Sequence, residues 1–357
     1  RAGNYWKGPC PFHHETDASF TISPDKGIFY CFGCHAGGDV IAFLAKAENL
    51  APYEAVQQLI DRFKISVPQE MIAESRQSIS ASTQEKTRYF AMCEAVAAWT
   101  HAALNQVAQA REYVASRGIT PEMVKLFTIG YMPGGLRAIE AFIKAMAQRG
   151  VLVKDLLYAG ILLERNGIYH SPFEERILFP ITDSLGRVCG FGGPIFRTGD
   201  DRAKYYNSKD LPYFSKGKLL FGFSLAKKTI HESQSAFLVE GYTDCVAMAQ
   251  YGYTNVVATL GTACTLDHLK MLSRHLKTLH VLYDGDAAGR KAITRLAEFC
   301  WEVNIELSIV ALPAKEDPAS FLSQGNDLNS LIAQSRDIFS FFISSVAGDA
   351  GTRTVSD

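Results

Sequence analysis

The sequence predicts a multidomain protein of mixed α+β and α/β class, and three observations carry this prediction. The chain has 357 residues, which corresponds to two or three domains at roughly 150 residues each. A dense cysteine and histidine motif lies within the first 65 residues. After about residue 228 the chain alternates continuous apolar runs with helical segments, which is typical of a parallel α/β sheet.

Composition and charge narrow the range of functions. The chain is 47% hydrophobic and 20% charged, which excludes wholesale disorder, and its formal net charge is −1. A polyanion would therefore have to meet a local basic patch. No apolar run approaches the ~20 residues that span a bilayer, and no basic-then-apolar signal segment opens the chain, so we expect a cytoplasmic protein without a membrane partner. The chain starts at Arg1 without a Met, which suggests that its natural start lies upstream.

Residues 1–65 contain a pattern of metal ligands. Cys10 and His13 form one pair, and Cys31 and Cys34 form a second pair after seventeen intervening residues. Three thiolates and one imidazole suit a single tetrahedral zinc ion with no open position, so we expect a structural zinc ribbon. His14 is the alternative histidine ligand, and reduced cysteines that meet by chance are the alternative to a metal site. The five remaining cysteines stand apart in apolar contexts and are expected to be reduced.

Aromatic residues lie within and between the two ligand pairs. They could stack on nucleic-acid bases or pack around the metal site, and the sequence leaves both options open. These residues are Phe12, Phe20, Phe29, Tyr30 and Phe32.

Residues 66–85 are polar and rich in Ser and Gln, and they are expected to form a flexible linker. A mixed α+β domain is then predicted over residues 86–228. Helical periodicity runs from Lys86 to about Phe127, and β-type runs between Leu156 and Phe223 predict an antiparallel sheet.

This middle region carries a local excess of cations interleaved with aromatic residues and a glycine-rich segment, Cys189–Pro194. Such a surface suits a groove that follows a phosphate backbone, and the glycines would let a polyanion approach closely. A solvated charged face with a glycine hairpin is the alternative. The cations are Arg176, Arg187, Arg197, Arg202, Lys204, Lys209, Lys216, Lys218, Lys227 and Lys228.

Residues 229–325 are predicted to form the parallel α/β domain, and residues 326–357 a short helical tail. Glu240 and Asp244 follow one strand, and Asp284 and Asp286 follow another, each before a helix. The carboxyl ends of parallel strands share one edge of a sheet, and carboxylates this close favour a divalent cation, Mg²⁺ or Mn²⁺. Asp317 follows the next strand and could join this site or cap the helix after Pro318. Taken singly, Asp-Gly-Asp is also an ordinary turn.

Along nearly its whole length the sequence resembles the bacterial DnaG-type DNA primases. Cys10-Pro-Phe-His-His-Glu and Tyr30-Cys-Phe-Gly-Cys-His are similar to the zinc-binding domain of that family. Val239-Glu-Gly-Tyr-Thr-Asp and Tyr283-Asp-Gly-Asp resemble the Toprim fold, which topoisomerases and some nucleases share. The stretches similar to the N-terminal part of the RNA polymerase core are Ala115-Ser-Arg-Gly-Ile, Glu175-Arg-Ile-Leu-Phe-Pro-Ile, Gly190-Phe-Gly-Gly, Lys204-Tyr-Tyr-Asn-Ser and Phe214-Ser-Lys-Gly.

The resemblance implies roles for individual residues. Glu240, Asp284 and Asp286 would hold the catalytic Mg²⁺, with Asp244 and Asp317 in support. The residues that would contact template or nucleotide are Arg117, Arg176, Lys204, Asn207 and Lys216. Two positions depart from the family pattern, because Ala319 stands where a further Asp is usual and Pro194 where an Arg is usual.

The function implied by the resemblance is the synthesis of short RNA primers on single-stranded DNA by two-metal nucleotidyl transfer, in the cytoplasm at replication forks. Its partners would be the template, ribonucleoside triphosphates and the RNA primer–DNA hybrid. A replicative helicase is expected for the family, but no helicase-binding domain follows within this chain. The first alternative is a non-catalytic zinc and Toprim protein of the recombination-mediator type. The second is a topoisomerase or Toprim nuclease, for which we find neither a strand-passage domain nor a Gly-x-x-x-x-Gly-Lys-Ser/Thr loop.

Overall fold

The computed structural model describes residues 5–13, 15, 18–48, 50, 52–65, 81–196, 201–283, 292, 293, 295, 296, 299, 302–313, 316–338 and 340. The chain divides into two compact units, Arg1–Gln84 and Glu85–Asp357. Among the described residues, no helix is both long enough and apolar enough to cross a membrane.

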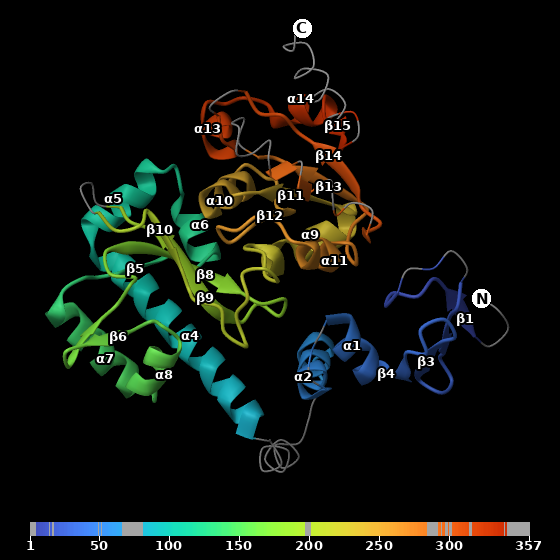
Figure 1. Cartoon of the computed structure of the whole chain (residues 1–357), viewed down its shortest axis with the longest axis horizontal. Coiled ribbons are helices and arrows are strands. Elements are labelled where there is room, and N and C mark those ends of the chain that lie inside the picture. Colours follow the sequence, from blue (N-terminus) through green and yellow to red (C-terminus); the bar gives the residue numbers. More distant parts are fainter. Residues whose placement is uncertain are drawn as a thin grey trace, which may run out of the picture. The chain divides into compact units, whose positions relative to one another are not determined.

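The N-terminal unit is a four-stranded antiparallel sheet followed by two helices (Figure 1). The strands are β1 (Trp6–Gly8), β2 (Phe20–Ser23), β3 (Ile28–Cys31) and β4 (Gly37–Asp39), in that spatial order, and the helices are α1 (Val40–Glu48) and α2 (Pro52–Phe63). Strand β3 alternates strictly, with Ile28 and Tyr30 exposed and Phe29 and Cys31 buried, as expected for a sheet with one covered face.

Four phenylalanine rings pack together in this unit. Phe12, Phe20, Phe29 and Phe43 have ring centroids 5.3 to 6.0 Å apart, a normal range for edge and stacked contacts. The buried residues of this small core are Cys10, Phe20, Phe29, Cys31 and Ala36. The two buried cysteines are part of the core itself, so the metal-ligand cluster and the hydrophobic core form one structure.

The second unit begins with helices and an antiparallel sheet of spatial order β10-β9-β8-β5. The helices are α4 (Ala81–Gln106), α5 (Ala108–Ser116), α6 (Pro121–Leu126), α7 (Leu136–Gln148) and α8 (Val153–Tyr158). The strands are β5 (Gly130–Met132), the hairpin β6 (Leu163–Arg165) and β7 (Ile168–His170), β8 (Arg176–Thr182), β9 (Val188–Pro194) and β10 (Tyr205–Asn207). Strands β8 and β9 are buried almost throughout because the helices shown in Figure 1 cover them.

The C-terminal part of this unit is a mostly parallel sheet of order β12-β11-β13-β14-β15. Its strands are β11 (Ser235–Val239), β12 (Val256–Ala258), β13 (Thr278–Val281), β14 (Glu306–Ile309) and the antiparallel β15 (Arg336–Asp337). Its helices are α9 (Phe223–Ser233), α10 (Tyr242–Gln250), α11 (Leu266–Leu272), α13 (Pro318–Ser323) and α14 (Leu328–Ala333). Strand β11 pairs in parallel with both β12 and β13, so Glu240 follows an interior strand of the sheet.

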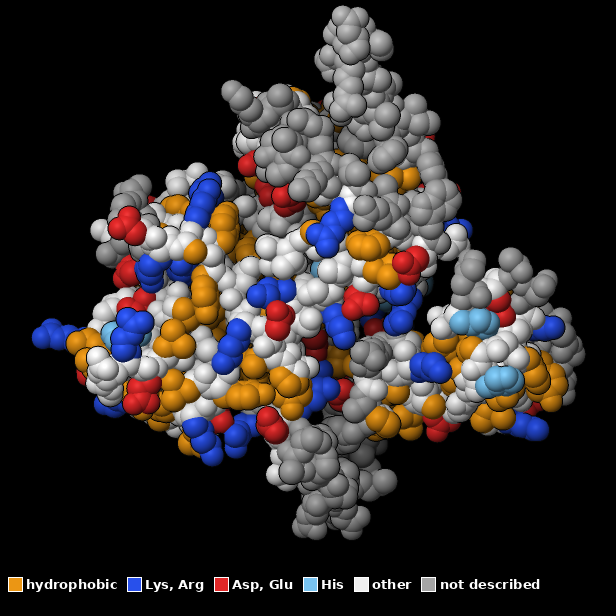
Figure 2. Space-filling view, in the orientation of Figure 1, with side chains coloured by type: hydrophobic (Ala, Val, Ile, Leu, Met, Phe, Trp, Pro, Cys, Tyr) orange, Lys and Arg blue, Asp and Glu red, His pale blue; other side chains and the backbone are white. Residues whose placement is uncertain are grey.

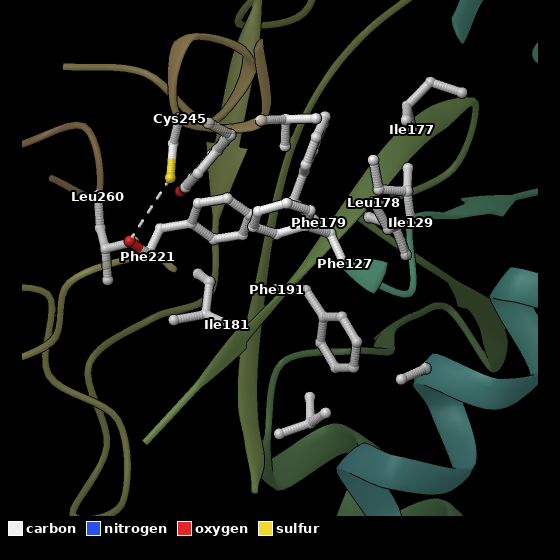
Figure 3. Packing of buried hydrophobic residues seen from close by; sticks show 14 of the residues in the cluster. Phe127, Ile129, Ile177, Leu178, Phe179, Ile181, Phe191, Phe221, Cys245 and Leu260 are labelled. Carbon is white, nitrogen blue, oxygen red and sulfur yellow. Dashed lines mark hydrogen bonds between the residues drawn. The ribbon is translucent and has the colours of Figure 1, made fainter. Parts of the chain in front are cut away.

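One hydrophobic core joins the antiparallel sheet to the parallel sheet (Figure 3). The Phe127 and Phe221 rings stack at 5.4 Å, and Phe179 of β8 stacks on Tyr242 of α10 at 5.5 Å. Cys245 of α10 is fully buried and its thiol faces the Phe221 carbonyl oxygen at 3.9 Å. The two sheets therefore fold as one body, and the core fixes residues from one sheet relative to residues from the other.

The predicted fold class is confirmed, with an N-terminal ribbon, a mixed α+β middle region and a parallel α/β sheet. One boundary differs, because α4 begins at Ala81, inside the segment predicted to be a linker up to residue 85. The helix continues the periodicity seen from Lys86, and Ser and Gln at its start do not prevent helix formation. The rest of the predicted linker, residues 66–80, lies outside the described residues.

Candidate metal and nucleotide sites

The structure brings Cys10, His13, Cys31 and Cys34 together. One ligand atom from each lies within 4.8 Å of all the others. Cys10 Sγ and Cys34 Sγ are 3.8 Å apart, and a tetrahedral zinc with ~2.3 Å Zn–S bonds separates two sulfurs by about 3.8 Å. Three sulfurs and one imidazole nitrogen with this spacing fit zinc and leave no position for a substrate, which supports a structural role.

Backbone geometry presents these ligands. The Phe12 amide lies 3.4 Å from Cys10 Sγ, and the Cys34 amide lies 3.4 Å from Cys31 Sγ, so each turn donates to its own first cysteine. Gly33 is required in the second turn, because a Cβ there would lie 2.6 Å from His13 Nε2. The Cys-x-x-Cys spacing therefore needs its glycine for steric reasons.

Glu15 organises the site and was given no role in the sequence analysis. Its carboxylate accepts hydrogen bonds from the Cys10 amide at 2.7 Å and from the Ser19 amide at 2.9 Å. It also lies 3.3 Å from His13 Nε2, which leaves His13 Nδ1 facing Cys31 Sγ at 3.8 Å. A carboxylate behind the imidazole of a zinc ligand fixes its tautomer and orientation. In the sequence, an acidic residue two positions after His13 was the signal that could have indicated this role.

The thiols of Cys31 and Cys10 differ in pKa. Burial acts to raise the pKa of the Cys31 thiol, but hydrogen bonds from Ser19 Oγ and from the amides of Cys34 and Gly33 outweigh it and lower that pKa to about 6. Burial raises the pKa of Cys10 to about 11. A thiol with a low pKa supplies the thiolate that zinc needs at neutral pH.

The open question about the aromatic residues is resolved by burial. Phe12, Phe20 and Phe29 pack in the core, whereas Tyr30 is 39% exposed and Phe32 is 66% exposed. The Tyr30 and Phe32 rings meet edge to face at 5.0 Å, and Tyr30 Oη lies 3.1 Å from His35 Nδ1. Hydrophobic side chains are visible on the surface of this unit in Figure 2. His14 lies outside the described residues.

The acidic edge of the parallel sheet begins where β11 ends. Glu240 follows Val239 directly and is half-buried, and Asp244 in the first turn of α10 is 8% exposed. Gly241 lies between them, and a Cβ there would lie 2.6 Å from Asp244 Oδ2, so a larger residue would displace that carboxylate. Asp284 and Asp286 lie outside the described residues, but β13 ends beside β11, and Glu240 contributes to raising the pKa of Tyr283, after the larger effect of burial.

Asp317 caps helix α13. Its Oδ1 accepts the Ser320 amide at 2.6 Å, and Ser320 Oγ in turn accepts the Asp317 amide at 3.0 Å, which forms a capping box. Helix α13 packs against α10, the helix that carries Asp244. Asp317 therefore caps α13, and its support of a divalent cation remains a prediction.

Arg176 is placed in the core. It is 2% exposed, and its guanidinium donates to the carbonyl oxygens of Pro172, Gly193, Ala203 and Lys204 at 2.7 to 3.3 Å. The guanidinium of Arg176 therefore connects β8 to Gly193 of β9 and to Ala203 and Lys204, the two residues that precede β10. This geometry favours a structural role over the contact with template or nucleotide that the resemblance implied.

The glycine-rich strand β9 accommodates protein groups, and the prediction that it admits a polyanion is wrong. A Cβ on Gly193 would lie 1.8 Å from the Ile177 carbonyl oxygen, and one on Gly190 would lie 2.5 Å from the Phe214 ring. A Cβ on Gly192 would lie 2.3 Å from Tyr242 Oη. At each of these glycines a neighbouring strand or side chain occupies the place that a Cβ would need. Pro194 ends this strand opposite Tyr205.

Arg187, another of the predicted cations, is bound within the second unit. It is paired with Asp183 at 2.7 Å and lies 4.0 Å from the Phe90 ring centroid, so it supports the β8–β9 hairpin. On the face drawn in Figure 2, Lys and Arg side chains are interspersed with acidic and hydrophobic ones.

Three of the predicted contacts lie around β10. The Lys204 ammonium is 5.7 Å from the ring centroid of Tyr205, a ring that is 44% exposed. The Arg117 guanidinium lies 5.3 Å from the Tyr113 ring centroid. Hydrogen bonds with Tyr113 raise the pKa of Arg117, and the electrostatic effects of Tyr113, Tyr205 and Asp317 act in the same direction.

Asn207 ends β10 and reaches into the parallel sheet region. Tyr242 Oη donates to its Oδ1 at 2.5 Å, and its Nδ2 donates to the Leu260 carbonyl oxygen at 2.8 Å. Both ends of the amide are therefore bonded to elements that flank Glu240.

The Lys216 backbone is held from two sides. The Asp210 carboxylate accepts its amide at 2.8 Å, and its carbonyl oxygen lies 3.0 Å from His268 Nε2. His268 is fully buried, and its Nδ1 accepts the Thr265 amide at 3.2 Å, so its Nε2 carries the proton. Sequence reasoning missed His268, because a lone histidine in a helix gives no signal of a partner 52 residues away.

Three family models match successive parts of the chain. Residues 1–75 match the CHC2 zinc finger, residues 99–227 match the DNA primase catalytic core, N-terminal domain, and residues 237–322 match the Toprim-like family. A DNA primase of Aquifex aeolicus is 37% identical over 346 residues, which cover 96% of this chain and 66% of that protein. A DNA primase of Clostridium acetobutylicum is 34% identical over 323 residues, which cover 90% and 52%. The chain thus spans about half to two thirds of the length of these relatives.

Solved structures agree with these matches. The zinc-binding and RNA polymerase domains of the Aquifex aeolicus primase superpose with a TM-score of 0.69 at 35% identity, covering 98% of this chain and 84% of that one. A DnaG primase catalytic domain bound to single-stranded DNA superposes with a TM-score of 0.66 at 31% identity, covering 73% and 86%. The CHC2 match and the four-residue cluster together support structural zinc, and the Toprim match indicates a divalent metal. The chain belongs to the DnaG-type DNA primase family.

Proposed function

We propose that this chain is the zinc-binding and RNA polymerase part of a primase, which starts RNA chains on single-stranded DNA and extends them into short primers. The observation that carries the proposal is the hydrogen bond that joins Asn207 of the antiparallel sheet to Tyr242 of α10, the helix that carries Asp244 and begins two residues after Glu240. Residues 1–65 would act on the template, residues 86–228 on template and nucleotide, and residues 229–325 in the chemistry.

The reaction is the in-line attack of a primer 3′-hydroxyl oxygen on the α-phosphorus of a ribonucleoside triphosphate. A new P–O bond forms, the bond to the β-phosphate oxygen breaks, pyrophosphate leaves, and the hydroxyl proton passes to solvent. Positioning and charge stabilisation supply most of the rate in phosphoryl transfer.

Glu240, Asp284 and Asp286 would hold Mg²⁺ or Mn²⁺, with Asp244 beside them, and Asp317 in support. Divalent cations held there would lower the pKa of the attacking hydroxyl and neutralise charge on the triphosphate. Arg117 and Lys204 would pair with phosphates, and Lys216 would contact the template or the nucleotide. The exposed Tyr205 ring next to Lys204 offers a face to a base.

The zinc-binding unit would help to choose where on the template a primer starts. Tyr30 and Phe32 are its exposed aromatic pair, and rings of this kind stack on single-stranded bases. Tyr30→Leu and Phe32→Leu are expected to change start-site choice on a template of mixed sequence. Ile28→Ala is the control, because Ile28 lies on the same face of β3 as Tyr30 but has no ring. Unaltered start sites in both aromatic variants would contradict this part of the proposal.

The test of the activity is synthesis from labelled ribonucleotides on single-stranded DNA with Mg²⁺. The wild-type chain should make short template-dependent RNA, and Asp284→Ala should make none while binding DNA as before. Supercoiled DNA is included in parallel. Relaxation or cutting of that DNA would favour a topoisomerase or nuclease, and DNA binding without synthesis by zinc-loaded, folded protein would favour a recombination-mediator type of protein.

A further inference from the structure

The side chain of Gln250 bridges the two parts of the second unit. Gln250 is the last residue of α10, the helix that begins at Tyr242 and carries Asp244 in its first turn. Its Nε2 donates to the Gly118 carbonyl oxygen at 2.8 Å, and its Oε1 accepts the Thr120 amide at 2.9 Å. One amide group therefore holds two backbone groups from a turn that lies about 130 residues earlier in the chain.

The turn held in this way is the one that follows Arg117. Arg117 ends α5 as its C-cap, Gly118 takes a positive φ of 72°, and Thr120 caps α6 by accepting the Met123 amide. The backbone thus changes direction within three residues, between two short helices. Such a turn is defined by its hydrogen bonds, and two of them come from Gln250.

Arg117 lies on the outer side of this turn, on the surface. Its Nε and Nη2 lie 3.3 and 3.2 Å from Tyr113 Oη, which holds the guanidinium along α5. Tyr113 Oη thus holds the side chain of Arg117, and the turn holds the Arg117 backbone. A shift of the turn moves the guanidinium relative to the acidic edge.

Helix α10 is attached to the preceding part of the second unit at both of its ends. At its start, Tyr242 Oη donates to Asn207 of β10 at 2.5 Å, and at its end Gln250 holds the Arg117 turn between α5 and α6. The same helix carries Asp244 and begins two residues after Glu240. Helix α10 therefore fixes the position of Asp244 relative to Asn207 and to the backbone of the turn after Arg117.

We propose that Gln250 is a positioning residue for nucleotide binding: it holds the turn after Arg117 to the end of α10 and so sets the distance from the Arg117 guanidinium to the acidic edge of the Toprim sheet. The inference rests on the proposed function, because it assigns Arg117 to the triphosphate. Gln250 does not touch the substrate and acts only through Arg117.

The test is a double-mutant cycle in the intact zinc-loaded chain, with primer synthesis on single-stranded DNA as the readout. Gln250→Ala should raise KM for an equimolar mixture of the four ribonucleoside triphosphates on the order of tenfold, with kcat changed far less. In an Arg117→Ala background the same substitution should have no further effect, because the residue it positions is gone. Gln148→Ala removes an exposed glutamine at the end of α7 and should leave KM unchanged.

A second measurement does not depend on activity. Hydrogen exchange of the peptide that contains Thr120 should become faster in Gln250→Ala and stay unchanged in Gln148→Ala. The role of Gln250 would be overturned if Gln250→Ala raised KM equally in the wild-type and Arg117→Ala backgrounds. It would also be overturned if Gln250→Ala changed neither KM nor the hydrogen exchange of the Thr120 peptide. Wild-type protein that makes no primer would instead contradict the proposed function, so the two failures are distinct.

Discussion

Tyr242 and Asn207 are joined by a 2.5 Å hydrogen bond in which the tyrosine hydroxyl donates to the amide oxygen. Tyr242 starts helix α10 in the parallel sheet region, and Asn207 ends strand β10 of the antiparallel sheet. The bond is enclosed, since Tyr242 is 4% exposed and a Cβ on Gly192 would lie within 2.4 Å of both partners. The orientation of the Asn207 amide is therefore set by the helix that carries Asp244.

Tyr242→Phe removes this bond while keeping the ring. We expect a loss of about 1 to 2 kcal/mol in the free energy of unfolding, because the Asn207 oxygen stays enclosed without its donor. Urea denaturation measures this loss. Tyr251→Phe is the matched control, because Tyr251 is the residue after α10 and is 47% exposed. Equal stabilities of the two variants would show that the bond contributes nothing.

His268 should make the stability of the second unit depend on pH. Burial lowers the pKa of His268 from 6.5 to about 4. The unfolded chain therefore binds a proton below about pH 6.5 that the folded chain accepts only near pH 4. Stability from this group is fully present above pH 6.5 and is lost as pH falls toward 4, by about 3 kcal/mol in all.

The measurement is the free energy of unfolding against pH for wild-type protein and His268→Gln. The difference between the two should shrink as pH falls from 6.5 to 4, whereas the exposed His231, replaced in His231→Gln, should leave the profile unchanged. A His268→Gln profile parallel to the wild-type profile would refute the linkage.

Glu15→Gln is expected to weaken zinc binding by about 10- to 100-fold, because the carboxylate that orients His13 and accepts the Cys10 amide loses its charge. Competition with a chromogenic chelator measures the affinity. Asp25→Asn neutralises an exposed carboxylate in the turn between β2 and β3 of the same unit and should have no effect. The same affinity for Glu15→Gln and wild-type protein would exclude Glu15 from the site.

Gly193→Ala should destabilise the second unit by several kcal/mol or prevent its folding. The new Cβ would lie 1.8 Å from the Ile177 carbonyl oxygen, and strand β8 cannot move away because the core packs against it. Gly217→Ala is the control, since its Cβ would lie 3.6 Å from Thr265 Cγ2 in ordinary contact. Thermal unfolding compares them, and similar melting temperatures would contradict the close approach of the two strands.

Local patterns predicted much of this structure. The alternation of apolar strands with helices located β11, β12, β13 and β14, and the two ligand pairs located the zinc cluster. Both signals are short in range, since they depend on periodicity and spacing along the chain.

Side-chain partners from distant parts of the chain were not predictable in this way. Arg176 resembled a substrate contact, yet it donates to backbone carbonyl oxygens up to 28 residues away. The glycines of β9 were expected to let a polyanion approach closely, yet Cβ atoms there would meet Phe214, Tyr242 and Ile177. A charge or a glycine has the same sequence signature in either role, and only the tertiary contacts distinguish them.

The most direct test of the central claim uses Glu240, the carboxylate at the end of β11. Glu240→Gln keeps the shape of the side chain and removes its charge. Primer synthesis from labelled ribonucleotides on single-stranded DNA is measured at saturating Mg²⁺ together with DNA binding. The account predicts short template-dependent RNA from wild-type protein, a loss of at least 100-fold in kcat for Glu240→Gln, and equal DNA affinity. Undiminished synthesis by Glu240→Gln would contradict the assignment of this sheet edge as the catalytic site.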